Sequence, residues 1–350
     1  MNLTITQPLK GLHRSVAVND ASHVGRLRRF VREQARSVDF SEETTEKAAI
    51  IATELATNLV KHTSKGGQVL ICKICMDGLS GLEFISLDCG PGVHNPGRML
   101  EDGHSTAGSP GTGLGAIRRL SHRFELHSQP GLGTVVFSQL LAKPPDRQFL
   151  QKKGGIAAVR CALAGEEKCG DDWAVADTDR GVVIMVADGL GHGPVAATAS
   201  QAARKIFLEN ATSSPAEILR KLHDGLRHTR GAAVAIAEID CQAEKIQYAG
   251  VGNISGSIVS PAGSQGCMSY NGTVGYQVRK IDQISYTFKR GNLLIMHSDG
   301  LKSKWNLSAY RDAFKSSPAV LSALLYRDFT RTTDDVTVVV ARADYRKAAS

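Results

Sequence analysis

A short stretch rich in proline, charge and glycine divides the sequence into two halves with different patterns. It runs KPPDRQFLQKKGG over residues 143–155, and paired prolines and paired glycines of this kind are typical of a linker. The chain has 350 residues, which is longer than one ordinary domain, so two domains with separate cores are expected. We therefore predict one domain over residues 1–142 and a second over residues 156–345.

The first half alternates helical and extended patterns. Apolar residues recur at helical spacing over residues 23–38 and 44–63, and Ser41 stands where it can cap the second helix. A loop rich in glycine, serine and threonine precedes a last short helix at 116–124. Strands are expected at residues 15–18, 68–76, 82–88, 124–129 and 133–141. This order predicts an α+β unit with its helices on one face of a mixed sheet.

Short strands dominate the second half. Helices are expected only at residues 195–210, 215–229 and 317–330. Strands are expected at residues 157–164, 173–178, 181–189, 232–240, 245–252, 254–260, 284–289, 292–300 and 336–342. Many short strands with few helices predict two packed antiparallel sheets flanked by helices.

Composition and charge narrow the classes of function. The formal net charge is +8, but basic residues are scattered among acidic ones and aromatic residues make up only 5% of the chain, so nucleic-acid binding is not predicted. The charge instead favours acidic or phosphorylated partners. No stretch approaches the roughly 20 apolar residues that cross a bilayer, and the N-terminus lacks the apolar core of a secretory signal. A cytoplasmic protein with no membrane span is expected.

The seven cysteines show no disulfide framework, which fits a reducing compartment. Cys72 and Cys75 form a CxxC motif, but they lie within an expected strand and no second pair follows at zinc spacing. We interpret them as strand residues.

Four aspartates of the second half stand where expected strands begin or end. Asp171 follows Gly170, Asp188 and Asp299 each end an apolar run before a glycine, and Asp334 opens DDVTVVVAR. Each Asp-Gly alone is a common turn, but the ordered set is hard to explain as turns. Carboxylates that converge repel one another unless cations lie between them. The set predicts two divalent ions about 4 Å apart, which would activate a bridging water against a phosphate ester.

Residues 156–342, and the string VADGLGHGPVAATAS above all, resemble the stage-II-sporulation-E branch of the metal-dependent PPM (PP2C-like) phosphatases, and especially its RsbX-like group. The resemblance implies an α-β-β-α sandwich and a phosphoserine or phosphothreonine phosphatase that uses Mn²⁺ or Mg²⁺. It implies that Asp188 bridges both metals and that the Gly189 carbonyl helps to bind one of them. It also implies that Asp171 binds the second metal, directly or through water, and that Asp299 and Asp334 hold the first.

Three neighbouring residues are weighed beside this set. Asp172 and Asp335 adjoin the implied ligands but occupy the wrong place in the pattern, so we interpret them as structural. His192, in the DGLGHG loop, is either a proton donor or a solvated loop residue, and both readings stay open. The chain has no Cys-x5-Arg loop, so covalent phosphocysteine chemistry is not predicted.

The first half carries a second group of residues suited to a ligand. Glu54 and Asn58 are four residues apart on an expected helix and therefore share a face, although a solvated polar face would look the same. An Asn oxygen can bind Mg²⁺, and a neighbouring Glu can act as a base. Asp88 ends a strand, with Gly90 and Gly92 behind it, and its carboxylate can accept from an adenine amino group.

The glycine-rich loop that follows is suited to polyphosphate. Its last residues directly precede a helix, and backbone N–H groups at a helix N-terminus bind phosphate well. These residues are Gly111, Thr112, Gly113, Leu114 and Gly115. The sequence GxxxxGK[ST] is absent, so a Walker-type ATPase is not predicted.

These strings, in this order, resemble the N, G1 and G2 boxes of the GHKL ATPase fold over residues 12–142, and most closely the RsbW/RsbT-like anti-sigma-factor and switch serine kinases. The resemblance implies an α/β sandwich that binds ATP and Mg²⁺. Asn58 would hold the Mg²⁺, Asp88 would bind adenine, Thr112 and the neighbouring glycines would contact phosphates, and Glu54 would act as the base.

Three hypotheses follow for the whole chain. The first is a bifunctional partner-switching regulator, with a switch-kinase-like module beside an opposing phosphatase. The resemblances imply STAS-type (anti-sigma-antagonist-like) proteins as its substrates and partners, sigma-regulatory proteins as further partners, and a homodimer as a candidate assembly. The second is a phosphatase whose GHKL half only binds nucleotide or a partner. The third, a scaffold with both sites degenerate, is disfavoured by the complete set of four aspartates.

Overall fold

The computed structural model describes residues 8–76, 79–100, 113–145, 155–310 and 312–343. The chain forms two compact units. One contains residues 9–150 together with 307–327, and the other contains residues 151–306 and 328–350. The domain boundary at residues 143–155 stays a prediction, and the sequence pattern assigns residues 307–327 to the second domain.

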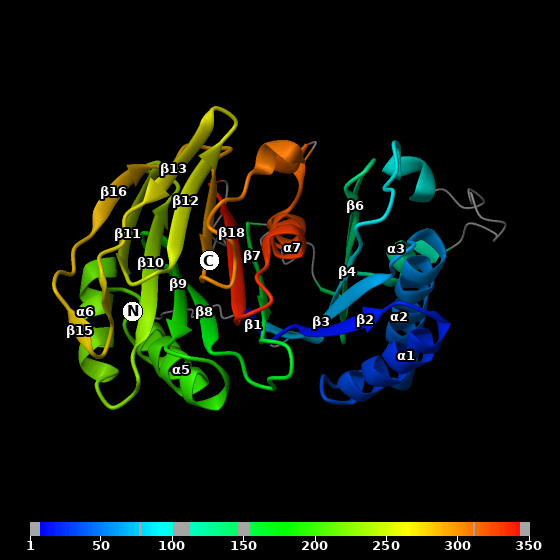
Figure 1. Cartoon of the computed structure of the whole chain (residues 1–350), viewed down its shortest axis with the longest axis horizontal. Coiled ribbons are helices and arrows are strands. Elements are labelled where there is room, and N and C mark those ends of the chain that lie inside the picture. Colours follow the sequence, from blue (N-terminus) through cyan, green and yellow to red (C-terminus); the bar gives the residue numbers. More distant parts are fainter. Residues whose placement is uncertain (1–7, 77–78, 101–112, 146–154, 311, 344–350) are drawn as a thin grey trace. The chain divides into compact units, whose positions relative to one another are not determined.

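A six-stranded sheet lies at the centre of the unit that contains residues 9–150 (Figure 1). Its strands are β1 (Pro8–Lys10), β2 (Arg14–Val18), β3 (Gly67–Met76), β4 (Leu79–Leu87), β5 (Arg123–Gln129) and β6 (Gly133–Leu141). The order is β1-β3-β4-β6-β5, and β2 also pairs with β3. The pairs β2–β3, β3–β4, β4–β6 and β5–β6 are antiparallel. A short turn joins β5 to β6, and a hairpin of this kind requires antiparallel strands.

Helices α1 (Ala21–Arg36), α2 (Glu42–His62) and α3 (Gly113–Leu120) cover one face of this sheet. Leu55 and Leu59 of α2, four residues apart, pack in one cluster with Val69 and Phe84 of the strands. The predicted cap is confirmed, because the Ser41 hydroxyl accepts a hydrogen bond from the Thr44 N–H at 3.1 Å.

The last helix of this unit differs from the sequence-based prediction. It begins at Gly113 and ends at Leu120, whereas the pattern predicts residues 116–124. The reason for its early end is the sheet, since the His122 N–H already donates to the Gln139 carbonyl of β6 at 2.8 Å. A short 3-10 helix, η1 (Pro96–Leu100), follows β4 and precedes this helix.

The second unit contains two five-stranded antiparallel sheets (Figure 1). Their orders are β16-β11-β10-β9-β8 and β13-β12-β17-β18-β7. The bounds are β7 (Ile156–Cys161), β8 (Asp171–Thr178), β9 (Gly181–Gly189), β10 (Ala232–Asp240), β11 (Lys245–Val251), β12 (Ser255–Ser260), β13 (Gly263–Cys267), β16 (Ile284–Thr287), β17 (Leu293–His297) and β18 (Val336–Arg342). A two-stranded hairpin, β14 (Gly272–Thr273) with β15 (Gln277–Val278), precedes β16. The two predicted antiparallel sheets are confirmed.

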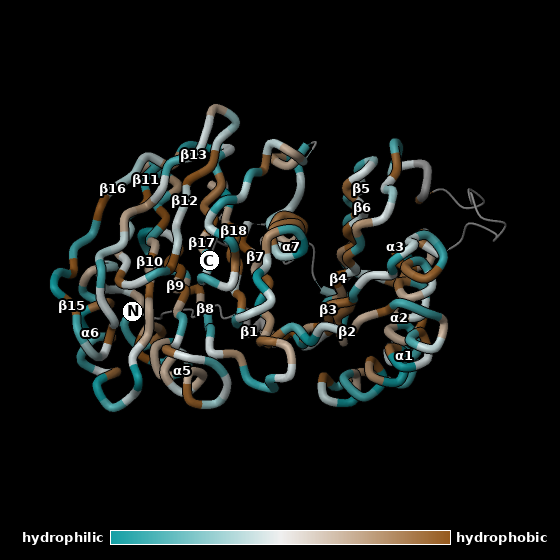
Figure 2. Tube along the Cα trace, viewed as in Figure 1, coloured by the Kyte–Doolittle hydropathy of each residue, from teal (hydrophilic) through white to brown (hydrophobic). Residues whose placement is uncertain are grey.

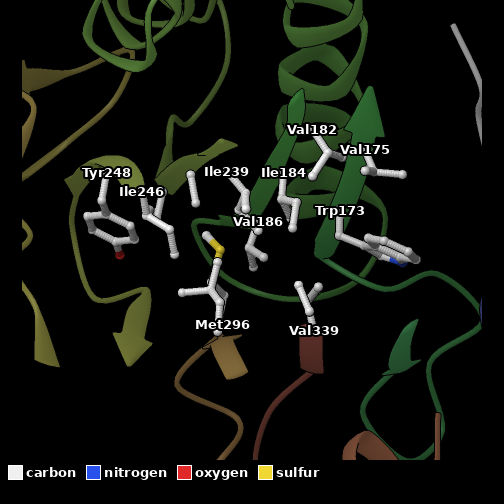
Figure 3. Packing of buried hydrophobic residues seen from close by; sticks show 14 of the residues in the cluster. Trp173, Val175, Val182, Ile184, Val186, Ile239, Ile246, Tyr248, Met296 and Val339 are labelled. Atoms are coloured by element: carbon white, nitrogen blue, oxygen red, sulfur yellow. The ribbon is translucent and has the colours of Figure 1, made fainter. Parts of the chain in front are cut away.

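The core of this unit lies between the two sheets. Figure 3 shows Trp173, Ile184 and Val186 of the first sheet pointing toward Met296 and Val339 of the second. Helices α5 (Gly193–Glu209) and α6 (Pro215–Gly225) pack on the outer face of the first sheet. Both faces of β9 are therefore buried, which explains its nearly continuous apolar sequence (Figure 2). It also places the polar end of the strand at the rim of the sheet.

Two other expectations concern the membrane and the cysteines. Within the described ranges, every helix is too short or too polar to cross a bilayer. All seven cysteines are free thiols. Cys72 is buried and Cys75 is exposed on the same strand, β3, so the interpretation of this motif as strand residues is confirmed.

Candidate functional site

Asp171 and Asp188 face each other across a pair of strands. Asp171 is the first residue of β8, Asp188 is next to last in β9, and the antiparallel register places the two residues directly opposite. Residues opposite each other in such a pair share a face of the sheet. The Ser298 hydroxyl donates a hydrogen bond to Oδ2 of Asp171 at 2.6 Å and holds that buried carboxylate in place.

Asp299 and Asp334 are brought together by the second sheet. Asp299 follows the end of β17 and Asp334 precedes the start of β18, and these two strands are antiparallel neighbours. The side-chain amide of Asn253 donates to Oδ2 of Asp299 at 2.8 Å. Oδ1 of Asp334 accepts the N–H of the following residue at 2.8 Å.

The other three acids lie close enough to Asp188 for their charges to act on its ionisation. Burial raises the pKa of Asp188 well above its usual value, and the charges of Asp171, Asp299 and Asp334 raise it further. Burial also raises the pKa of Asp171. For Asp299, burial and then the charge of Asp334 raise the pKa in the same way. We call these four residues the carboxylate cluster.

The carboxylate cluster fits divalent cations in its chemistry. Carboxylate oxygens are the ligands that Mg²⁺ and Mn²⁺ prefer, and sheltered carboxylates that repel one another are stabilised by cations between them. Among the described residues, however, no group of three or more His, Cys, Asp and Glu side chains is arranged to hold an ion as it stands.

The two neighbouring acids have other partners. Oδ1 of Asp172 forms an ion pair with Arg160 at 2.9 Å, and both side chains are almost completely buried. Asp335 accepts the backbone N–H of Leu163 at 2.8 Å with one oxygen and that of Gly170 at 2.7 Å with the other. Both acids thus have a structural function in this unit, which supports their separation from the carboxylate cluster.

We expect Asp172→Asn to destabilise the second unit strongly. The change would leave the Arg160 guanidinium buried without its counter-charge, which costs about 3–5 kcal/mol. Chemical denaturation should show this as a lower midpoint for the unfolding of this unit. Asp224→Asn, which alters an exposed ion pair with Arg227, is the matched control and should shift the midpoint very little. Equal midpoints for the two variants would contradict the structural function of Asp172.

The loop after Asp188 is shaped by close backbone approaches. A Cβ added to Gly189 would lie 2.1 Å from the Ala196 carbonyl oxygen of α5, so only glycine fits there. His192 is the N-cap residue of α5 but makes no capping hydrogen bond with its side chain, and its Nδ1 lies 2.9 Å from Oε1 of Glu166. Its side chain is 62% exposed, so this geometry leaves both readings of His192 open.

In the other unit, α3 begins against α2. A Cβ added to Gly113 would lie 2.8 Å from Oε2 of Glu54 and 3.5 Å from Oδ1 of Asn58. The face of α2 that carries Glu54 and Asn58 therefore points at the N-terminus of α3. Nδ2 of Asn58 is buried and has no hydrogen-bond partner among the described residues. An unpaired buried amide is costly, and a ligand in this place would satisfy it.

Asp88 lies at the end of β4 in a turn built from glycines. Its Oδ1 accepts the N–H of Gly90 at 2.8 Å and that of Thr134 at 3.2 Å, and burial raises its pKa. Gly92 has a φ of +62°, and a Cβ there would lie 2.0 Å from the Gln129 carbonyl oxygen. Only glycine tolerates this conformation and this contact together.

The structure describes only the last part of the glycine-rich loop. Gly111 and Thr112 lie outside the described residues. Gly113, Leu114 and Gly115 form the first turn of α3. The side chain of Leu114 belongs to the core, so any contact of this residue with a phosphate would come from its backbone N–H.

Ser298 and Asn253 are functional candidates that the sequence pattern does not single out. Each is hydrogen-bonded to a member of the carboxylate cluster. Ser298 could be found from the sequence, because it directly precedes Asp299. Asn253 lies 46 residues before its partner, and only the fold brings the two together.

Two family profiles match the chain, one in each half. The profile described as stage II sporulation protein E (SpoIIE) matches residues 178–344. The profile of the histidine kinase-like ATPase domain matches residues 17–139. The first match contains Asp188, Asp299 and Asp334, and the second contains Glu54 and Asp88.

Individual relatives show the same division. The chain is 29% identical over 182 residues to the phosphoserine phosphatase RsbX of Bacillus subtilis (strain 168), which covers 51% of this chain and 89% of that protein. It is 34% identical over 109 residues to the serine/threonine-protein kinase RsbT of the same organism, which covers 31% of this chain and 81% of that protein. A solved structure from work on the bacterial stressosome, a modular system adapted to control secondary-messenger signalling, is 30% identical with a TM-score of 0.50. It covers 54% of this chain and 98% of that one.

Proposed function

This chain belongs to the histidine kinase-like ATPase family in its first half and to the SpoIIE-type phosphatase family in its second, and from this we propose that it is a bifunctional partner-switching regulator. The second half removes phosphate from phosphoserine or phosphothreonine in a STAS-type protein. The first half binds Mg²⁺ and ATP and phosphorylates a protein of the same class. A phosphate adds a charge of about −2 to such a surface and decides which partner it binds.

The observation that carries the phosphatase proposal is the opposition of Asp171 and Asp188 within a sheltered set of acids. We assign two Mn²⁺ or Mg²⁺ ions to the carboxylate cluster. Asp188 would bind both ions and the Gly189 carbonyl would help to bind one of them, while Asp171 would serve the second ion and Asp299 and Asp334 the first. Bound ions would supply a water of lowered pKa and a positive charge that orients the phosphate. Ser298 and Asn253 would position Asp171 and Asp299 for this purpose.

The nucleotide proposal rests on the close approach of α2 and α3. Asn58 would hold Mg²⁺ through its side-chain oxygen, and the first N–H groups of α3 would bind phosphates. The Asp88 carboxylate would accept from the adenine amino group, while Gly90 and Gly92 keep the backbone close. Glu54, next to Gly113, would accept the proton of the attacking serine hydroxyl.

The second candidate function is a phosphatase whose first half binds ATP without transferring phosphate. Glu54 distinguishes the two. Purified protein, Mg²⁺, radiolabelled ATP and a STAS-type partner should give a labelled partner, and Glu54→Gln should reduce the labelling rate by about 100-fold or more while ATP still binds. Glu43→Gln, which changes an exposed residue of the same helix, is the control. ATP binding without labelling by the unmodified protein would leave the non-catalytic alternative.

The proposed partner is a class of protein. A STAS-type protein with a regulatory serine fits both halves, and a homodimer through the first half is a further proposal. The direct test is Mn²⁺-dependent release of phosphate from a phosphoserine STAS protein. Release that needs no divalent ion would contradict the proposed metal site.

A further inference from the structure

A segment from the second half of the sequence folds with the first compact unit. Residues 307–327 lie between Asp299 and Asp334 in the sequence, yet they group with residues 9–150. The segment contains two short 3-10 helices, η2 (Leu307–Ala309) and η3 (Ala313–Lys315), and most of helix α7 (Pro318–Phe329). We call residues 307–327 the strap.

The strap is hydrogen-bonded to β5 at two places. The Ser317 N–H donates to Oε1 of Glu125 at 2.8 Å. Nε2 of Gln129 donates to the Ala309 carbonyl at 3.2 Å. Glu125 and Gln129 are four residues apart on β5, the edge strand, so the strap is fixed along the edge of the sheet rather than at one point.

The last residue of the strap is bonded to the candidate adenine-binding residue. Nη1 of Arg327 donates to the backbone carbonyl of Asp88 at 3.0 Å. The same carbonyl oxygen is closely packed, since a Cβ added to Gly133 would lie 2.1 Å from it. A ligand bound to the Asp88 side chain would therefore contact the same residue whose backbone carbonyl is bonded to the strap.

The two ends of the strap lead to the carboxylate cluster. Outside the strap, the Arg331 N–H donates to the Gly300 carbonyl at 2.7 Å, and the Lys302 N–H donates to the Phe329 carbonyl at 2.9 Å. This pairing begins one residue after Asp299 and ends three residues before Asp334. The chain thus leaves and returns beside two of the proposed metal ligands.

A chain of hydrogen bonds also reaches a third proposed ligand. The Trp305 indole N–H donates to Nε2 of His297 at 3.0 Å. An indole can only donate, so Nε2 accepts, and the Nδ1–H of the neutral ring donates to the Ser298 carbonyl at 2.8 Å. The hydroxyl of Ser298 in turn holds Asp171. Trp305 stands two residues before the strap begins.

From these contacts we propose that the strap couples the two sites, so that an adenine nucleotide bound at Asp88 changes the rate of the phosphatase. The inference rests on the proposed ATP site. The strap is bonded to the backbone of Asp88 at Arg327. The segments that flank the strap are hydrogen-bonded beside Asp299, and Trp305 is linked through His297 to Ser298, which holds Asp171. Coupling of this kind is a free energy shared by two sites, and it commonly amounts to a factor of about 5 to 150.

The test measures phosphatase activity with and without nucleotide. The full chain is assayed with p-nitrophenyl phosphate at a fixed concentration of free Mn²⁺, and binding of a non-hydrolysable ATP analogue is measured separately by calorimetry. Saturating analogue should change kcat/KM of the wild type by at least about fivefold. In Arg327→Ala the analogue should still bind, but the change should fall below about twofold. Arg227→Ala, an exposed arginine elsewhere, should respond like the wild type.

Three results would contradict the proposal. If the analogue binds the wild type and activity does not respond, the coupling is wrong while the proposed function stands. If the analogue does not bind at all, the ATP site and the coupling are both wrong, and calorimetry identifies this case. Should Arg327→Ala not fold, Gln129→Ala, which removes the bond to the Ala309 carbonyl, replaces it. A full response in the folded strap variant would show that the strap is not the route.

Discussion

Asp188→Asn is expected to abolish phosphatase activity, with a fall in kcat/KM of at least about 1,000-fold. Asp188 faces Asp171 across the strands, and its pKa is raised by the charges of both Asp299 and Asp334, so it lies close to the ligands of both proposed ions. Asparagine keeps the shape of the side chain and removes the charge that would hold the cations. The measurement is Mn²⁺-dependent release of phosphate from a phosphoserine protein.

The same substitution should raise the stability of the metal-free protein. Burial and the neighbouring acids raise the pKa of Asp188, which means that the folded state disfavours a charge at this position. The neutral amide removes that penalty, so the unfolding midpoint in chelator should increase, and added Mn²⁺ should no longer increase it. Asp224→Asn, an exposed aspartate, should keep both activity and the Mn²⁺ effect. An inactive Asp188→Asn protein that is also less stable in chelator would point to misfolding instead of a lost metal ligand.

Much of the fold could be predicted because strand and helix periods are local properties. The continuous apolar run of β9 predicts a strand buried on both faces, and the pairing with β8 and β10 agrees. The end of α3 could not be predicted, because it depends on a bond between His122 and β6. The hairpin of β14 and β15 is also missed, since its strands have only two residues each and leave no period to detect.

In the candidate sites, too, local sequence patterns mark some residues and long-range contacts determine the others. Asp188 and Asp299 stand at the ends of apolar runs, so the sequence alone marks them. The separation of Asp171 from Asp172 rests in the sequence on the family resemblance alone, and the structure adds a physical reason, because Asp172 forms an ion pair with Arg160. The bond of Arg327 to the Asp88 carbonyl spans 239 residues and has no local signal at all. Long-range contacts of side chains are the part that sequence patterns cannot supply.

Asn58→Ala is expected to reduce the affinity for Mg²⁺-ATP by about 100-fold, because a bond from a neutral side chain to a charged ligand contributes about 1.5–3 kcal/mol. The free energy of unfolding of Asn58→Ala should hardly differ from that of the wild type. The buried Nδ2 of Asn58 has no hydrogen-bond partner among the described residues, so its removal leaves no described group without a bond. A residue with only a structural function would behave in the opposite way, with lower stability and unchanged affinity.

Calorimetric titration with Mg²⁺-ATP and thermal unfolding of the same samples separate these cases. Thr57→Ala, the preceding residue on α2, is the matched control and should keep its affinity. Phosphatase activity without nucleotide should remain in both variants, since the proposed ligands of the metal ions lie in the other unit. Wild-type affinity in Asn58→Ala would remove the Mg²⁺ assignment from this residue. The N-terminus of α3 beside Glu54 would then be the remaining basis for a nucleotide site.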